Sequence, residues 1–257
     1  MQQCGQSLHR ELQRYGTETS RPSVDIRLYE KMVSRERRPH VFAEADILRL
    51  LQASETFRLA RAPLRHVVVR AMLTLAYCTG LRVGELGTLR LGDVDTDSGS
   101  LEIVETKFFK SRRLPLSDSA LAVMRDYLEK RAAAGAPNER DTSLWWCPNR
   151  RSGYGPEAAA YFLTEAMRRA GLKPARGVQE PRVHDLRHTF VAHRMLQWYR
   201  EGVEPQRRLQ YLATHLGHKD IRSTLAYMHA QPELLQQASE RYRKRGVDAL
   251  QILGELK

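Results

Sequence analysis

The chain has 257 residues, with 42 Lys and Arg against 30 Asp and Glu, and a formal net charge of +12. An apolar fraction of 42% excludes global disorder, and the absence of any run of about twenty apolar residues excludes a membrane span. The three cysteines are odd in number and far apart, so we expect no disulfide framework and a reducing, cytoplasmic setting. A folded chain this basic is expected to bind a polyanion, and nucleic acid is the first partner to consider, ahead of an acidic membrane surface.

The first part of the chain changes from a polar segment to helices and then to strands. Residues 1–40 are polar and rich in arginine, and we expect an arm that buries little surface. Apolar residues at helical spacing predict a helix over 42–54. The nearly continuous apolar stretch 64–80 predicts a helix buried on most sides, which Gly80 ends before the next helix begins. Residues 93–117 alternate and contain turn signals, which predicts an antiparallel sheet of two or three strands.

Helical patterns return after the predicted sheet. They indicate helices over 120–133, 156–170, 184–199, 205–215 and 219–229, with a last one over 231–245. The run LWW at 144–146 predicts a short strand. We therefore expect a mainly α fold with a small antiparallel β-sheet (α+β), in which residues 41–257 form one domain and 231–257 its C-terminal tail.

Two stretches in the first half of the chain contain basic side chains of interest. In TGLRVGEL (79–86), Arg82 and Glu85 are three residues apart, so on a helix they share a face and can pair, as surface ion pairs often do. The stretch TKFFKSRRLPLS supplies a basic hairpin, which is either a solvated loop or a finger that reaches a phosphate backbone. Its basic residues are Lys107, Lys110, Arg112 and Arg113.

Three stretches in the second half add histidines, an arginine and a tyrosine. In HDLRH, His184, Arg187 and His188 fall on one face at the start of a helix, where buried positive charge needs an anionic partner. His218 follows the glycine of LGH, and Tyr227 lies within the helix that comes next. On its own, such a tyrosine is usually a packing residue.

Together, these side chains suit nucleophilic displacement at a phosphodiester. A tyrosine hydroxyl can attack phosphorus while two arginines neutralise the non-bridging oxygens, because guanidinium groups bind phosphate through two parallel hydrogen bonds. A histidine can accept the tyrosine proton, and a lysine can protonate the leaving 5′ oxygen. This chemistry needs no metal and no cofactor.

The five stretches, in this order and spacing, resemble the tyrosine recombinase (phage integrase) family, whose catalytic domain is similar to that of type IB topoisomerases. The resemblance runs from about residue 41 to about residue 230. It implies a tyrosine recombinase catalytic-domain fold and the following residue roles. The catalytic residues are Arg82, Lys107, His184, Arg187, His218 and the nucleophile Tyr227, with Glu85 and His188 in support, Lys110 as a rival of Lys107, and Lys110, Arg112 and Arg113 as DNA contacts.

The resemblance also implies a site-specific recombinase that cleaves and rejoins double-stranded DNA through a 3′-phosphotyrosine, without metal or ATP, and moves or resolves a mobile element. Four copies normally assemble on two DNA sites, alone or with other recombinases, and the tail 231–257 docks on a neighbouring copy or on its own domain. Such a protein acts at the bacterial nucleoid. Family members usually carry a helical core-binding domain, so residues 1–40 suggest a truncated member or a clamp supplied by another protein.

Three other interpretations of the same sequence are open. The first is a DNA-binding protein that keeps the fold without catalysis, and the second is a topoisomerase that only relaxes DNA. The third is a zinc site built from His215, His218, His229 and Cys147, in which only the first two residues form a close pair.

Overall fold

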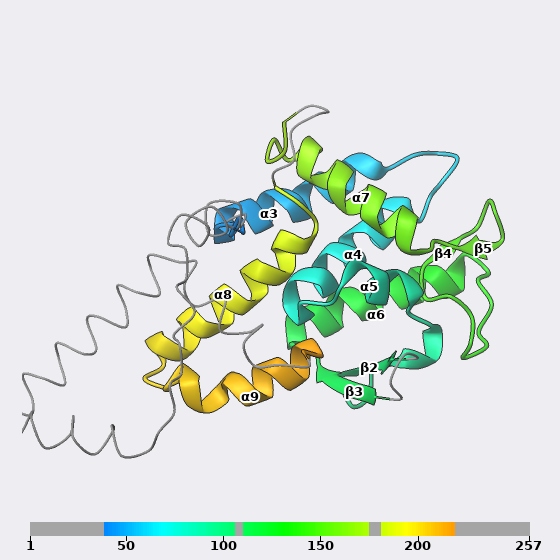
Figure 1. The fold of residues 1–257 in the computed structure, drawn as a ribbon. Coiled ribbons are helices and arrows are strands. Elements are labelled where there is room, and N and C mark those ends of the chain that lie inside the picture. The colour runs from blue at the N-terminus through cyan, green and yellow to red at the C-terminus, as the bar shows by residue number, and fades with distance from the viewer. Residues whose placement is uncertain (1–38, 106–109, 175–180, 219–257) are drawn as a thin grey trace, which may run out of the picture. The chain divides into compact units, whose positions relative to one another are not determined.

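The computed structural model of the chain describes residues 39–105, 110–174 and 181–218. Its elements in chain order are α3 (Glu44–Ala53), η2 (Ser54–Phe57), α4 (Arg65–Thr79), α5 (Val83–Thr88), η3 (Leu91–Asp93), β1 (Val94–Asp95), β2 (Ser100–Glu105), β3 (Lys110–Pro115), α6 (Asp118–Ala133), β4 (Trp146–Cys147), β5 (Ser152–Gly153), α7 (Pro156–Arg169), α8 (His184–Arg200) and α9 (Pro205–Leu216). The fold is mostly helical, as predicted, and contains two small antiparallel sheets among the described residues (Figure 1). The helices expected over 219–229 and 231–245 lie outside the described residues.

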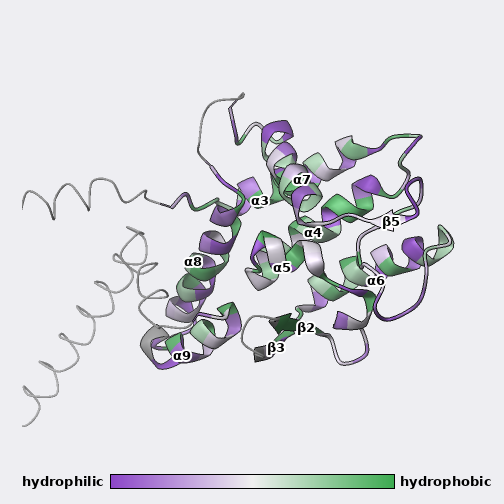
Figure 2. Cartoon of the chain, turned by 45° about the vertical axis from the view of Figure 1, so that its right-hand side comes forward, coloured by the Kyte–Doolittle hydropathy of each residue, from purple (hydrophilic) through white to green (hydrophobic). Residues whose placement is uncertain are grey.

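Helix α4 is the central helix of the core. Its residues Val68, Val69, Ala71 and Met72 are fully buried, because α3, α6, α7 and α8 pack around it. Burying a valine or methionine side chain contributes roughly 1.5–3 kcal/mol, so this helix supplies a large part of the hydrophobic stabilisation. Figure 2 shows α4 among the surrounding helices, with hydrophobic stretches along it in green. The helix ends where predicted, at Gly80, whose φ of 64° is left-handed and suits a residue without Cβ.

Helix α9 follows α8 and contacts it at one side of the core (Figure 1). A second apolar cluster joins them, made of Phe190, Val191, Met195, Trp198, Leu209, Leu212 and Leu216. The last residue of this cluster is also the last residue of α9. The packing therefore fixes the C-terminal end of α9 relative to α8 and to the end of α4.

The predicted sheet has three strands in the order β1-β2-β3, all antiparallel. Strand β3 lies against the C-terminal end of α9. The run LWW contributes to a second sheet, in which Trp146 and Cys147 of β4 pair with β5. We expected only one sheet, since the polar and glycine residues of β5 lack the alternation by which strands are recognised. No described helix is both long and apolar enough to cross a bilayer.

Candidate active site

Arg82 and Glu85 form the predicted ion pair, but not as two residues on one helix face. Arg82 precedes α5 with extended dihedrals (φ −68°, ψ 147°), so it is the N-cap residue and Glu85 is in the first turn. The Arg82 backbone N–H donates to Glu85 Oε2 at 2.9 Å, and Arg82 Nη1 lies 2.9 Å from Oε1. Glu85 thus holds Arg82 in place through two groups of Arg82, the backbone N–H and the guanidinium group.

The Glu85 carboxylate is kept ionised by its donors. Burial raises its pKa, but the hydrogen bonds from Arg112 and from the Arg82 backbone, together with both guanidinium charges, outweigh burial and hold the pKa below its ordinary value. Glu85 is therefore a permanent negative charge between two arginines.

Arg187 is 2% exposed, yet its guanidinium group cannot lose its charge. Nη1 donates to the Gly80 carbonyl at 2.8 Å, and Nη2 donates to the Leu216 carbonyl at 2.7 Å. Both carbonyls lie at helix C-termini, α4 and α9, where backbone oxygens lack partners within the helix and the dipole favours a cation. The buried charge is thereby compensated by the ends of two helices.

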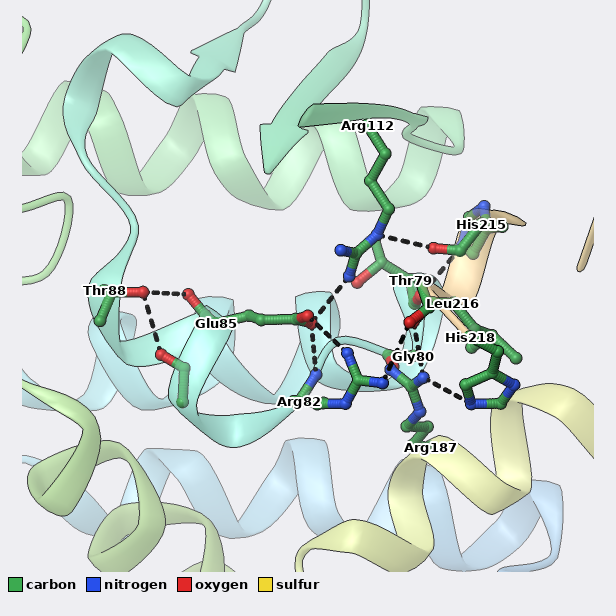
Figure 3. Close-up of polar contacts among 12 residues, drawn as sticks. Thr79, Gly80, Arg82, Glu85, Thr88, Arg112, Arg187, His215, Leu216 and His218 are labelled. Carbon is green, nitrogen blue, oxygen red and sulfur yellow. Dashed lines mark hydrogen bonds and ion pairs between the residues drawn. The ribbon is translucent and has the colours of Figure 1, made fainter. Parts of the chain in front are cut away.

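Three consecutive carbonyls at the end of α9 each accept a hydrogen bond from a different arginine (Figure 3). Arg112 Nε donates to the His215 carbonyl at 2.9 Å, and Arg82 Nη2 donates to the Gly217 carbonyl at 3.3 Å. Arg187 Nη2 donates to the carbonyl of Leu216, which lies between these two residues in the chain. We call Arg82, Arg112 and Arg187 the arginine cluster. It is anchored by one helix end and brings three positive charges together.

His218 adjoins the arginine cluster. Its Nε2 lies 2.9 Å from Arg187 Nη2, and because a guanidinium group only donates, Nε2 accepts and the imidazole is neutral. Burial, then the charges of Arg187 and Arg82, lower the pKa of His218 to about 4. The imidazole is therefore an uncharged neighbour of a strongly positive site.

The HDLRH motif begins helix α8 as predicted. The rings of His184 and His188 are one turn apart and meet edge to face, with centroids 4.9 Å apart. An electrostatic interaction with His184 also contributes to the lowered pKa of His218. The helix start therefore brings His184 and Arg187 to the same site as His218.

The remaining predicted residues lie elsewhere. Lys107 and Tyr227 fall outside the described residues, and Lys110 is the first residue of β3. Arg113 is exposed on β3, opposite Glu102. Arg112, which we expected to contact DNA, has a side chain that is 9% exposed and lies 2.8 Å from Glu85.

The sequence contains a signal for the position of Arg112 that motif reasoning missed. Side chains alternate along a strand, so Arg112 shares a face with Leu114, which is 1% exposed. Its partner across the sheet is Ile103, also buried. Period-two alternation on β3 thus directs Arg112 inward and Arg113 outward.

The described residues bring no three His, Cys, Asp or Glu side chains together as metal ligands. His215 Nε2 donates to the Thr79 carbonyl at 2.9 Å, whereas His218 Nε2 accepts from Arg187. Each imidazole thus already uses one nitrogen within the protein. Cys147 lies in β4 of the second sheet, and His229 lies outside the described residues.

Comparisons with known proteins give the family and the fold. The model of the phage integrase family matches residues 40–233. Protein y4rB of Sinorhizobium fredii (strain NBRC 101917 / NGR234) is 35% identical over 218 residues, 82% of this chain and 68% of y4rB. Tyrosine recombinase XerD of Caulobacter vibrioides is 33% identical over 199 residues, 77% of this chain and 59% of XerD.

Among solved structures, a crystal structure of XerA recombinase matches with a TM-score of 0.61 at 21% identity, over 81% of this chain and 65% of that chain. A crystal structure of XerH bound to its palindromic difH substrate matches with a TM-score of 0.60 at 17% identity, over 80% of this chain and 54% of that chain. The expected tyrosine recombinase catalytic-domain fold is thereby confirmed. The chain spans between 54% and 68% of the length of these four relatives.

Proposed function

This chain belongs to the phage integrase family, and on that premise we propose that it is a site-specific recombinase that cleaves and rejoins double-stranded DNA through a 3′-phosphotyrosine at Tyr227. The observation that carries the proposal is the convergence of the arginine cluster and His218 at the end of α9, just before the segment that contains Tyr227. Such a concentration of positive charge in a partly buried site suits a phosphate group.

In the proposed reaction, the scissile phosphate lies against Arg82 and Arg187. The Tyr227 hydroxyl oxygen attacks phosphorus, a bond forms between the two, and the bond from phosphorus to the 5′ oxygen breaks. The tyrosine proton passes to His184, and Lys107 gives a proton to the departing 5′ oxygen, with Lys110 as the alternative donor. The 5′-hydroxyl of a partner strand then attacks the phosphotyrosine and regenerates Tyr227.

The arginines act on the charge that develops on the two non-bridging oxygens. Groups preorganised toward such charge cost no reorganisation when the reaction occurs, and removing one commonly lowers the rate about 10²- to 10³-fold. Arg187 is preorganised by its two carbonyl acceptors, and Arg82 by Glu85. His218 supplies a hydrogen bond to the phosphate, and His188 supports the helix start that carries His184 and Arg187.

The wider organisation is part of the same proposal. Residues 41–257 form the catalytic domain, the basic hairpin residues Lys110 and Arg113 contact DNA, and the tail 231–257 docks on its own domain or on a neighbouring copy. The protein assembles as a homotetramer on two DNA sites, alone or with other recombinases, in the bacterial cytoplasm. The recombined DNA belongs to a mobile element.

A covalent-adduct assay tests the chemistry. Nicked duplexes from the DNA flanking the gene are incubated with the chain, so that a short fragment diffuses away after cleavage and the adduct accumulates. Tyr211→Phe is the matched control, because Tyr211 is a highly exposed tyrosine of α9 (76% exposed). We expect adduct with the wild type and with Tyr211→Phe, and none with Tyr227→Phe.

An adduct formed by Tyr227→Phe would contradict the proposed nucleophile, and a wild type that forms none on any flanking duplex would contradict the recombinase proposal. Plasmid relaxation without a specific site would instead favour the topoisomerase interpretation. Mapping the adduct positions would at the same time identify the recombination site.

A further inference from the structure

Arg112 is the one member of the arginine cluster to which the catalytic motifs assign no role in the reaction. It lies on the inner face of β3, paired across the sheet with the buried Ile103, and its side chain is 9% exposed. A buried guanidinium group is poorly placed to serve as a peripheral DNA contact. The position of Arg112 therefore indicates another function for this residue.

The Arg112 guanidinium group links three elements. Nη2 lies 2.8 Å from Glu85 Oε2 in α5, and Nε donates to the His215 carbonyl at the end of α9, 2.9 Å away. Arg112 itself belongs to β3. Strand β3, helix α5 and the end of α9 are thus joined by one side chain.

The charges around Glu85 show what Arg112 contributes. Glu85 is 14% exposed and bonds both Arg82 and Arg112, so one negative charge lies between two positive charges. Without Arg112, the carboxylate would be balanced by Arg82 alone. The pair would then be neutral, and the attraction of Arg82 for a phosphate would fall, since charges within a few ångströms act together in a partly buried site.

We propose that Arg112 is a positioning residue of the cleavage reaction: it neutralises Glu85, leaves the charge of Arg82 for the scissile phosphate, and ties β3 to the end of α9. This inference rests on the proposed function and deepens it. It replaces the expectation, drawn from sequence, that Arg112 contacts DNA.

Single-turnover adduct formation separates the two roles. The rate at saturating nicked duplex and the dissociation constant of that duplex are measured for Arg112→Gln, Arg112→Lys and the control Arg125→Gln. Arg125 is an exposed arginine that also donates to a backbone carbonyl, that of Thr96, at 2.7 Å, and it takes no part in the arginine cluster.

We expect Arg112→Gln to lower the saturating rate about 10- to 100-fold, the range typical of small misplacements and lost supporting contacts, with little change in duplex affinity. Arg112→Lys should recover part of the rate, because one ammonium group can neutralise Glu85 but lacks the fork that also holds the His215 carbonyl. Arg125→Gln should match the wild type. Weakened duplex affinity with an unchanged saturating rate would overturn the proposal and restore the DNA-contact role.

A double-mutant cycle tests the path through Glu85. If Arg112 acts by neutralising Glu85, the loss caused by Arg112→Gln becomes smaller when Glu85→Gln is already present, because no carboxylate charge remains to cancel. Fully additive losses would overturn this explanation. The unfolding midpoints of all variants are measured in parallel, so that a rate loss caused by a folding defect is recognised.

Calorimetric titration with inorganic phosphate at low ionic strength separates the failure of this inference from that of the recombinase proposal. We expect phosphate to bind the wild type and Arg125→Gln more tightly than Arg112→Gln. If no protein forms an adduct but this order holds, the recombinase proposal fails, whereas the inference that Arg112 neutralises Glu85 and leaves the charge of Arg82 for a phosphate stands. Equal phosphate affinity in all three proteins would overturn the positioning role.

Discussion

Replacing Gly80 by alanine tests how the end of α4 supports the site. Gly80 has a φ of +64°, and a Cβ added to it would lie 2.6 Å from Phe190 Cδ1 and 3.2 Å from Leu216 Cδ2. Both neighbours belong to the cluster that joins α8 and α9. The Gly80 carbonyl is also an acceptor for Arg187. One added methyl group therefore strains the backbone and pushes against the packing of α9.

The expected destabilisation has two parts. A residue with Cβ in the left-handed region costs about 1–2 kcal/mol. Forcing an extra methyl group into a packed interior costs about 1–3 kcal/mol more, because buried ring and leucine atoms cannot move freely. We expect Gly80→Ala to lower the free energy of unfolding by about 2–5 kcal/mol, the sum of these two ranges.

Gly171→Ala is the matched control. Gly171 has nearly the same φ, +69°, but nothing lies within 4 Å of an added Cβ. It should therefore show only the backbone cost of about 1–2 kcal/mol. Urea unfolding followed by circular dichroism measures both variants, and adduct formation at a temperature where both are folded measures activity. Equal losses of stability in the two variants would refute the packing argument, and unchanged activity in folded Gly80→Ala would refute the link to Arg187.

Three further predictions concern side chains of the site and the core. The pKa of His218 is about 4 against an ordinary 6.5, so between these pH values the unfolded chain takes up a proton that the folded chain does not, and the free energy of unfolding should fall as the pH falls from 6.5 to 4. Histidine NMR should show the low pKa of His218 in the free protein and a higher pKa with phosphate bound. An ordinary pKa in the free protein would contradict the site electrostatics. Arg187→Lys should lower cleavage about 10²- to 10³-fold in the adduct assay, because an ammonium group cannot serve both carbonyls and the phosphate, and near-normal cleavage would show that the fork is unnecessary. Tyr127→Phe should lower the free energy of unfolding, measured in urea, by about 1–3 kcal/mol. The reason is that the buried hydroxyl donates to the Leu144 carbonyl at 2.6 Å and accepts from the Trp146 backbone N–H at 3.0 Å. An unchanged unfolding midpoint would mean that neither hydrogen bond contributes to stability.

Sequence periodicity predicted the elements that carry the site. Helix α4 follows from its continuous apolar run and its terminal glycine, and the start of α8 follows from the spacing of His184, Arg187 and His188. These features are local, since one turn of helix determines which side chains share a face. The same holds for the ion pair of Arg82 with Glu85, although the sequence did not show that Arg82 caps the helix rather than lying in it.

The acceptors of the arginine cluster could not be predicted in the same way. The carbonyls of Gly80, Leu216 and Gly217 are backbone groups, so no residue type marks them, and they become acceptors only because two helices end close to one another. The inward direction of the Arg112 side chain was predictable in principle from the alternation of side chains along β3. The prediction of a DNA contact used only its positive charge within a basic run and not its face of the strand.

The hydrogen bonds from the arginine cluster to the end of α9 also affect the order in which the protein folds. The hydrogen bonds that anchor the cluster join residues 135, 103 and 29 positions apart in the chain. Contacts of such separation form late, because long loops must be closed before the contacts can contribute. A chain that has formed its helices but not their final packing would hold no assembled phosphate site. The proposed ability to cut DNA would then appear only in the last stage of folding, and newly made or partly unfolded copies would leave DNA uncut.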